Sequence, residues 1–216
     1  MYAQICTRPN ISFVAGMLGR YQSNPGMEHW KAAKKVLRYL QGTKCHMLTY
    51  RRSNHLEVIG YSDSDFAECV DSRKSTLGYV FLLARGAISW KSEKQIVVAS
   101  LTMKAEFVAC FEATIQANWL RNFISGLGIV DSAKPLKMYC DNSAAVFFSK
   151  NDKYSKGAKR MELKYFAVKE EVQKQRVSIE HISTNLMIAD LLTKGLLPKT
   201  FIEHVKNMSI IVTNDC

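Results

Sequence analysis

The sequence predicts an α/β fold in which a mixed five-stranded sheet is flanked by helices and preceded by a small helical segment. Three successive segments rich in β-forming residues, joined by short links, favour an antiparallel meander. Two further short apolar segments alternate with stretches of helical spacing, which favours a sheet covered by helices. The hydrophobic content of 47% is enough to build the packed core that such a fold needs.

Residues 1 to about 53 form the expected helical segment. Apolar residues recur at three- or four-residue steps from Ile11 to Tyr21, and again from Trp30 to Leu40. Pro25-Gly26 interrupts the two patterns, and Gly42 is suited to a C-terminal cap. We therefore expect two helices here.

The meander is expected in the three segments that come next. Their ranges are Leu56–Tyr61, Thr76–Leu83 and Ala87–Trp90, with a turn at Arg85-Gly86. The remaining elements are expected as a strand at Leu136–Cys140, helices at Ser143–Ser149 and Glu162–Lys174, a strand at Val177–His181, a helical turn at Ile188–Thr193 and a terminal helix at Pro198–Met208.

A long helix is expected between the meander and the fourth strand. Thr102 can cap it, and Gly126 and Gly128 end it. Its apolar face is expected at Val108, Phe111, Ile115, Trp119 and Phe123. Trp90 and Trp119 have apolar neighbours, so we expect both to be core residues rather than platforms for stacked bases.

The net charge of +11 comes from 30 Lys and Arg residues against 19 Asp and Glu residues. Such a charge favours a polyanionic partner, because each phosphate that is neutralised releases condensed counterions, and nucleic acid is the first candidate. A basic surface without a particular partner explains the composition equally well.

Cysteine spacing and hydropathy indicate the cellular compartment. The six cysteines contain no CxxC pair, which favours reduced thiols in an intracellular protein. Arg8, Pro9 and Asn10 interrupt the N-terminal stretch, so neither a signal peptide nor a membrane span is expected. A cytoplasmic or nuclear location follows as the expectation.

Four short acidic motifs each place a carboxylate at the edge of an apolar segment. They are Tyr61-Ser62-Asp63-Ser64-Asp65, Ala105-Glu106-Phe107, Tyr139-Cys140-Asp141-Asn142 and Ile188-Ala189-Asp190-Leu191. A hard divalent cation such as Mg²⁺ prefers oxygen ligands, and converging carboxylates supply them. The pattern indicates a metal-dependent site for phosphate chemistry.

Each acid also has an ordinary structural explanation. Asp63 could end a strand in solvent, Glu106 could complement a helix N-terminus, Asp141 could cap the next helix, and Asp190 could lie on the surface. Taken singly, each of these explanations is the better one.

The surrounding motifs, taken together, favour the metal site. Tyr61 to Ala67, Arg73-Lys74-Ser75-Thr76, Gly86 to Ser92, Ala105-Glu106-Phe107, Tyr139 to Asn142 and Ile188 to Lys194 occur in this order. In that order they resemble the ribonuclease H domain of a copia-type LTR retrotransposon Pol polyprotein. The resemblance covers nearly the whole chain, and the run of motifs is far more specific than any one of them.

The resemblance implies the site and the reaction. Asp63, Glu106, Asp141 and Asp190 become the catalytic and metal-binding acids, with Asp65 as a neighbour. Two Mg²⁺ ions, which Mn²⁺ could replace, would support cleavage of the RNA strand of an RNA/DNA hybrid during reverse transcription.

The resemblance also implies an organisation into two parts. Residues 1–53 look like the C-terminal helical tail of the reverse transcriptase or connection region, and residues 54–216 like the ribonuclease H-like domain. The polymerase part of a Pol polyprotein is then a candidate partner. Because the paired aspartates of the polymerase palm are absent from the sequence, we expect no DNA synthesis by this chain alone.

Basic residues outside the acidic motifs are candidates for binding the nucleic-acid backbone. They are Arg73, Lys74, Lys91, Lys159 and Arg160. Such contacts would hold the duplex without reading its sequence. Singly, each of them is also explained as a solvated charge.

Five positions depart from the usual pattern of the family. They are Arg160 in place of a common histidine, Glu68 in place of glycine, Leu77 in place of a small polar residue, Lys104 in place of an acid and Leu191 in place of proline. The histidine could assist proton transfer or product release, so its replacement is expected to slow turnover. We expect the fold to persist and the activity to be weakened, as in a decayed or truncated genomic copy.

Two alternatives remain open at this level. The first is a non-catalytic nucleic-acid-binding remnant of a Pol polyprotein, with a basic surface and a defective cation site. The second is another polynucleotidyl transferase such as an integrase core, which would be expected to use three acids and would leave Ala189-Asp190 without a counterpart.

Overall fold

A mixed sheet of five strands forms the centre of the molecule, in the order β4-β3-β2-β5-β6. β2 (Val58–Ser64), β3 (Thr76–Leu83) and β4 (Gly86–Lys94) form an antiparallel meander, whereas β5 (Leu136–Cys140) and β6 (Val177–His181) run parallel to β2. The computed structural model describes residues 2–53, 56–67, 69, 71–128, 134–150 and 159–213, with the backbone alone for residues 159–162. The predicted mixed five-stranded sheet is confirmed.

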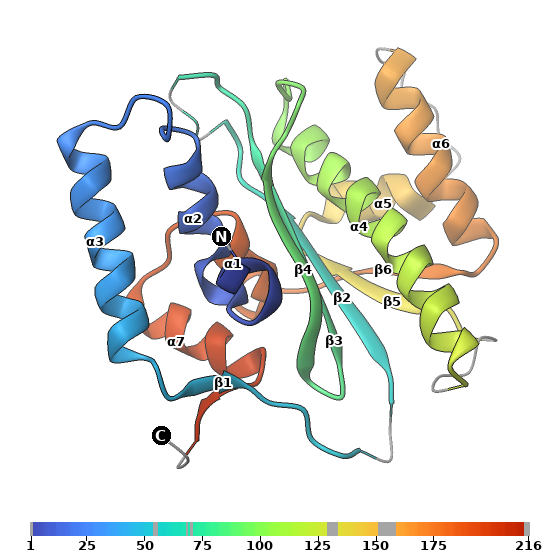
Figure 1. The fold of residues 1–216 in the computed structure, drawn as a ribbon. Coiled ribbons are helices and arrows are strands. Elements are labelled where there is room, and N and C mark those ends of the chain that lie inside the picture. The colour runs from blue at the N-terminus through green and yellow to red at the C-terminus, as the bar shows by residue number, and fades with distance from the viewer. Residues whose placement is uncertain are drawn as a thin grey trace.

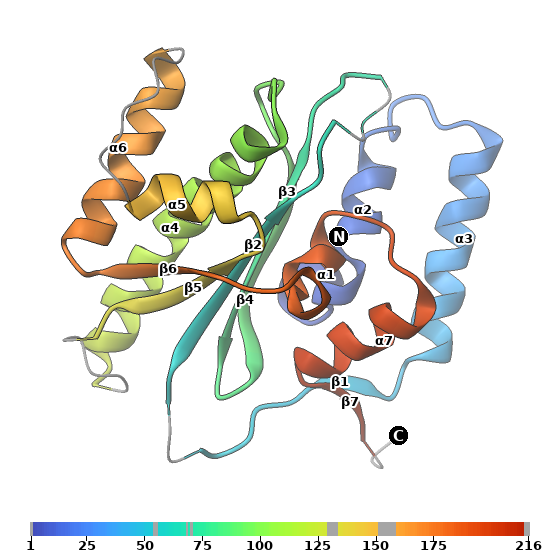
Figure 2. The same cartoon turned by 180° about the vertical axis from the view of Figure 1, so that it is seen from behind.

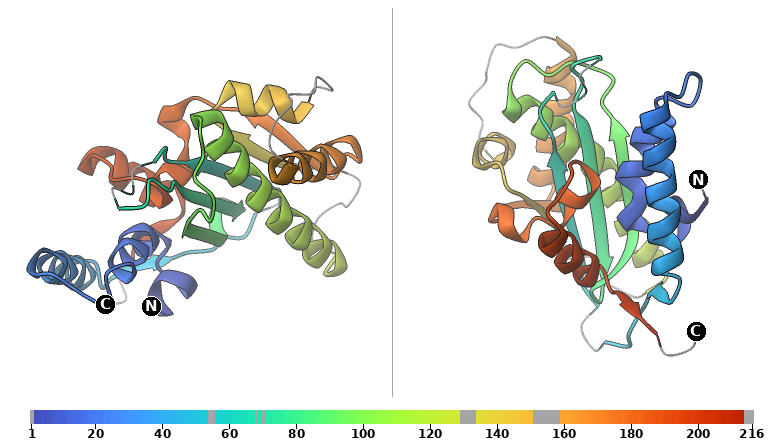
Figure 3. Two further views of the ribbon diagram at one scale, coloured as in Figure 1. Left: turned by 90° about the horizontal axis from the view of Figure 1, so that it is seen from above. Right: turned by 90° about the vertical axis from the view of Figure 1, so that its left-hand side faces the viewer.

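Helices cover both faces of this sheet (Figures 1 and 2). One face carries α4 (Thr102–Gly126), α5 (Ser143–Lys150) and α6 (Lys159–Gln173). The other side carries α1 (Tyr2–Cys6), α2 (Ser12–Gly19), α3 (Met27–Gly42) and α7 (Pro198–Asn207). The described residues also form the 3-10 helices η1 (Pro9–Ile11), η2 (Thr184–Leu186) and η3 (Ile188–Leu192). Seen from above in Figure 3, the sheet separates α4 from the blue N-terminal helices.

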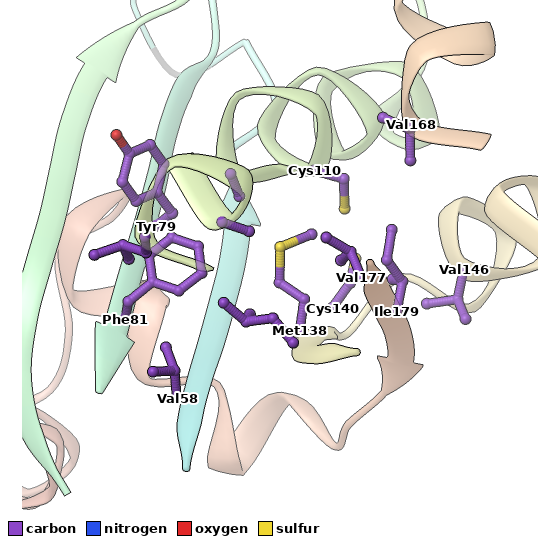
Figure 4. Packing of buried hydrophobic residues seen from close by; sticks show 14 of the residues in the cluster. Val58, Tyr79, Phe81, Cys110, Met138, Cys140, Val146, Val168, Val177 and Ile179 are labelled. Carbon is purple, nitrogen blue, oxygen red and sulfur yellow. The ribbon is translucent and has the colours of Figure 1, made fainter. Parts of the chain in front are cut away.

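The residues of β3 alternate between two hydrophobic cores, because both faces of the strand are covered. Tyr79 and Phe81 belong to the core beneath α4, which Figure 4 shows. Val80 and Leu82 belong to a second core, which η3 and α7 close from the opposite side. The continuous apolar run Thr76–Leu83 is therefore a strand buried on both faces.

The predicted apolar face of α4 is buried only in its first part, where Val108 is 8% exposed and Phe111 packs against the core. Ile115, Trp119 and Phe123 are 52%, 57% and 52% exposed, so the expectation that Trp119 is a core residue is wrong. The fully buried stripe consists of small residues four apart, Ala105, Ala109, Ala113 and Ala117. Small side chains let the helix approach the sheet closely, while the rings of Trp119 and Phe123 project outward and stack on each other with their centroids 5.2 Å apart.

The ends of two helices also differ in detail from the prediction. Thr102 was predicted to cap α4 but is the first residue of this helix. The N-cap of α4 is Leu101, which makes no capping side-chain hydrogen bond. α3 ends at Gly42 as expected, but the C-cap is Thr43.

The N-terminal segment is joined to the rest of the chain by a second, two-stranded sheet. β1 (His46–Leu48) pairs antiparallel with β7 (Ile210–Val212), and neither strand was predicted. Trp90, predicted as a core residue, is half-buried and packs against the second core, and its Nε1 donates a hydrogen bond to the Gln4 carbonyl oxygen at 2.6 Å. These contacts hold the helical segment against the central sheet, while a domain boundary at residues 53/54 stays a prediction.

Among the described helices, none combines the length and the apolar character needed to cross a membrane.

Candidate metal centre

Two parallel strands bring the first and third acids to the same edge of the sheet. The β2–β5 register pairs Tyr61 with Tyr139, and Asp63 and Asp141 each follow two residues later. Ligand sites of open α/β sheets form outside the carboxyl ends of such strands. Asp63 is 1% exposed and Asp141 is partly exposed, so the site opens to solvent on the Asp141 side.

The other two acids come from α4 and η3. Glu106 lies early in α4 and is 4% exposed, and Asp190 in η3 is 5% exposed. η3 can lie close to the sheet because the β3 residue that faces it is Gly78. Gly78 pairs with Asp63 in the β2–β3 register. A Cβ atom at residue 78 would stand 2.7 Å from Thr193 Cγ2, so a side chain there would push the η3 segment away.

The four acids converge as two overlapping groups that share Asp141. One carboxylate oxygen from each of Asp63, Asp141 and Asp190 lies within 4.8 Å of the other two. Glu106 and Asp141 form a second group at the same separation, together with the Cys140 thiol. The acidic motifs, which are far apart in the sequence, thus meet in one place.

Hydrogen bonds orient two of the carboxylates. Thr193 Oγ1 donates to Asp63 Oδ2, and Thr184 Oγ1 donates to Asp141 Oδ2 at 3.0 Å. His181 Nε2 is hydrogen-bonded to the Asp141 backbone oxygen at 3.0 Å. Carboxylates held in this way keep their remaining oxygen atoms directed at the site.

Lys194 is a member of the site that sequence analysis did not single out. Its Nζ lies 2.9 Å from Asp190 Oδ1 and 3.6 Å from Asp63 Oδ2. The i,i+4 spacing from Asp190 was readable in the motif, but Asp63 is distant in the sequence, so the bridging position needed the fold. The ammonium group is thus an internal counter-ion for two of the four acids.

Burial and mutual repulsion favour the protonated forms of Glu106, Asp190 and Asp63. Burial, with the Asp63 carboxylate adding to it, raises the pKa of Glu106 to about 11. Burial and Asp63 likewise raise the pKa of Asp190 to about 7. The pKa of Asp63 is also raised by burial, against the opposing effects of Lys194 and Thr193. Burial lowers the pKa of Lys194, but Asp63 and Asp190 outweigh it and leave that pKa raised.

The donor set fits a hard divalent cation. Glu106 Oε2 is buried and has no hydrogen-bond partner among the described residues. A buried carboxylate oxygen without a partner is costly, and a cation bound among the acids would satisfy it and reverse the upward pKa shifts. Carboxylate oxygens are the ligands that Mg²⁺ and Mn²⁺ prefer.

Asp65 follows Asp63 by two residues, just after the end of β2. Its Oδ1 accepts a hydrogen bond from the Thr76 backbone N–H at 2.7 Å. In the described part of the chain it belongs to neither group of potential ligands. Asp65 therefore holds the β2–β3 pair together at the edge of the site.

The candidate backbone-binding residues have different surroundings. Arg73 is exposed and Lys74 is partly exposed, whereas Lys91 Nζ pairs with Glu93 Oε2 at 2.5 Å. The side chains of Lys159 and Arg160 lie outside the described residues.

The positions that depart from the family pattern are found both in the core and on the surface. Leu77 and Leu191 are both 3% exposed and belong to the hydrophobic cores. Lys104 Nζ donates to Ser100 Oγ at 3.0 Å. Glu68, like the side chain of Arg160, lies outside the described residues.

No family model matches the chain, but two relatives identify its family. It is 39% identical over 208 residues to the retrovirus-related Pol polyprotein from transposon TNT 1-94 of Nicotiana tabacum, a match that covers 96% of this chain and 15% of the relative. It is 34% identical over 205 residues to that from transposon RE2 of Arabidopsis thaliana, covering 95% of this chain and 14% of the relative.

The chain thus belongs to the retrovirus-related Pol polyproteins of copia-type transposons, and it spans about 15% of the length of these curated relatives. Among solved structures, it is similar to LC11-RNase H1 in complex with an RNA/DNA hybrid, with a TM-score of 0.46 and 17% identity. That similarity covers 63% of this chain and 94% of the other.

Proposed function

We propose that this chain carries the ribonuclease H function of a copia-type Pol polyprotein, cutting the RNA strand of RNA/DNA hybrids with the help of divalent cations. The observation that carries the proposal is the meeting of Asp63, Glu106, Asp141 and Asp190 at one edge of the sheet. The homology to a retrovirus-related Pol polyprotein over 96% of the chain supports it. Mg²⁺ is the proposed ion, and Mn²⁺ its substitute.

The residues of this chain would hold the metal and keep its ligands aligned. Asp63, Glu106, Asp141 and Asp190 are the proposed ligands, and Thr193 and Thr184 fix the carboxylates of Asp63 and Asp141. Bound divalent cations would activate a water molecule and stabilise the leaving oxygen of the phosphodiester. Lys194 would have to give up its ion pairs as a cation takes over the negative charge.

The substrate would be recognised by shape and charge. Contacts to 2′-hydroxyl groups distinguish an RNA strand from a DNA strand, and basic side chains hold the backbone without reading sequence. Arg73 and Lys74 are proposed contacts that form no ion pair with the described residues, and Lys91 would first have to leave Glu93. Lys159 and Arg160 complete the proposed set.

We assign the two regions of the chain accordingly. Residues 1–53 are proposed to be the tail of the reverse transcriptase region, and residues 54–216 the ribonuclease H-like domain. The β1–β7 pair would then fasten the tail to the end of the domain, and the polymerase part of a Pol polyprotein is the proposed partner.

A labelled RNA/DNA hybrid incubated with the purified chain and Mg²⁺ tests the function. Cleavage by the unaltered chain that disappears in Asp63→Asn, with the far-ultraviolet spectrum unchanged, supports the nuclease. The matched control is Asp71→Asn, because Asp71 is an exposed acid that accepts a hydrogen bond from Tyr21 and takes no part in the site. Hybrid binding without cleavage in all three proteins would contradict it.

That contradicting result would favour the second candidate function, a non-catalytic nucleic-acid-binding remnant. One observation supports this non-catalytic remnant. Lys194 already neutralises part of the charge on Asp63 and Asp190, so the fold does not need a metal ion to hold these two acids together. The replacements at Arg160 and Glu68 also favour a slower enzyme than an intact relative.

A further inference from the structure

A thiol belongs to the same set of potential ligands. Cys140 Sγ and a carboxylate oxygen from each of Glu106 and Asp141 lie within 4.8 Å of one another. Cys140 is 0% exposed at the end of β5, and Figure 4 shows it between the sheet and α4, near Cys110. Mg²⁺ takes oxygen ligands, so the proposed nuclease function leaves this sulfur atom unused.

Neither of the two buried groups in this set has a strong partner. Glu106 Oε2 has no hydrogen-bond partner among the described residues. The partners of Cys140 Sγ are the Asn142 carbonyl oxygen, at 4.0 Å, and the neighbouring Cys110 thiol, and both contacts are weak because a thiol is a weak donor and a weak acceptor. A buried carboxylate oxygen without a partner, directed at a thiol, is an arrangement that a metal ion would complete.

We propose that Glu106, Cys140 and Asp141 bind a thiophilic divalent cation, such as Zn²⁺ or Cd²⁺, and that this cation displaces Mg²⁺ and stops the nuclease. Zn²⁺ accepts thiolate and carboxylate ligands at about 2.0–2.3 Å, which places the ligand atoms roughly 3.5 Å apart. Ligand atoms within 4.8 Å of one another therefore need to move by roughly 1 Å.

The charge balance of such binding is favourable. The thiol gives its proton to solvent as the metal–sulfur bond forms, the Glu106 carboxyl group does the same, and no electrons are transferred. One divalent cation thus replaces two protons, and the net charge of the buried site is unchanged. Because Asp141 is shared with Asp63 and Asp190, a cation held by Cys140 takes a ligand from the proposed Mg²⁺ site. The inhibition rests on the proposed function, whereas the binding does not.

The test is a titration of the full chain with Cd²⁺, followed by the ultraviolet charge-transfer absorption of cadmium thiolate. Cys140→Ser is compared with Cys110→Ser, a matched buried cysteine that is 1% exposed and is not a member of the ligand group. Cys6, Cys45 and Cys69 can also bind Cd²⁺, so the relevant signal is the part lost in Cys140→Ser and kept in Cys110→Ser. Mn²⁺ binding to each variant, measured by calorimetry, shows that the acidic site is intact.

We expect the Cys140→Ser chain to lose one cadmium-thiolate signal and about tenfold or more in Cd²⁺ affinity, with Mn²⁺ binding retained. Inhibition of hybrid cleavage by Zn²⁺ should weaken to a similar extent. An unchanged Cd²⁺ signal in Cys140→Ser would overturn the proposal, and Cys140→Ala decides the matter if the serine variant does not fold. The Cd²⁺ readout needs no cleavage, so a chain that binds Cd²⁺ through Cys140 but cuts no hybrid refutes the nuclease alone.

Discussion

The two halves of the acidic site differ in how their charge is balanced. On one side, Lys194 contacts both Asp63 and Asp190, so the chain supplies its own cation. On the other side, Glu106 has a buried oxygen atom without a partner, and its pKa is raised to about 11, chiefly by burial. One half can therefore be stable without metal, while the other retains a proton until a cation arrives. This difference separates the residues that keep the site folded from those that make it bind metal.

The largest expected effect is on activity in Glu106→Gln. At neutral pH and without metal, Glu106 carries a proton, so glutamine is close to the same group and folding stability should change little. The loss of one metal ligand removes several kcal/mol of transition-state stabilisation, and cleavage should fall by about 10²-fold or more. Hybrid cleavage and thermal melting measured on the same preparation check this. A large drop in melting temperature with activity retained would show that Glu106 stabilises the fold and does not bind the metal.

Lys194→Met should show the opposite behaviour. Removing one partner of a fully buried ion pair costs about 3–5 kcal/mol, and because this side chain is 29% exposed, a loss nearer ~2 kcal/mol is expected. Urea denaturation without metal measures the free energy of unfolding, and Lys194→Arg, which keeps the charge, is the control. Mg²⁺ should restore more stability to Lys194→Met than to the unaltered chain. Equal stability of the methionine and arginine variants would show that the ion pairs do not support the fold.

The pH dependence of metal-free stability sharpens the same contrast. Burial, with Asp63 adding to it, raises the pKa of Asp190 from 3.8 to about 7, so between these values the folded chain binds more protons than the unfolded one. Its free energy of unfolding should therefore fall as the pH rises from about 4 to about 7. Asp190→Asn should remove this part of the slope in denaturation series at matched ionic strength. A slope of the opposite sign, or one unchanged in Asp190→Asn, would contradict the account.

The smallest expected effect concerns Asp141, which both halves share. Thr184→Val removes the 3.0 Å hydrogen bond to Asp141 Oδ2. This hydrogen bond is exposed to solvent and contributes at most about 0.5–1.5 kcal/mol to stability. Mn²⁺ affinity should fall by about tenfold or less, with unfolding free energy nearly unchanged. Calorimetric titration of Mn²⁺ measures this, and a complete loss of binding would mean that Thr184 acts on more than one ligand.

The sequence predicted the bounds of the strands better than the buried face of the helix α4. Thr76–Leu83, Leu136–Cys140 and Val177–His181 have the predicted bounds, because short apolar runs between polar segments signal buried strands directly. The exposed face of α4 could not be read in this way, because its aromatic stripe has the same helical period as the alanine stripe that packs on the sheet. The β1–β7 pair joins two three-residue segments from opposite ends of the chain and has no local signal.

The four acids could be named in advance because each lies in a motif at an element boundary. Their counter-ion could not, since Lys194 acquires its role only when β2 and the η3 segment are brought together by the close contact at Gly78. Cys140 was visible in its motif, but the orphaned Glu106 oxygen beside it needed the packing of α4 on β5.

The most direct test of the central claim is a crystal of this chain soaked in Mn²⁺ and measured for anomalous scattering. The account predicts density for the ion among Asp63, Glu106, Asp141 and Asp190, with Lys194 Nζ moved away from Asp63. Saturating Mn²⁺ that leaves no anomalous peak there, with Lys194 still bridging Asp63 and Asp190, would contradict it.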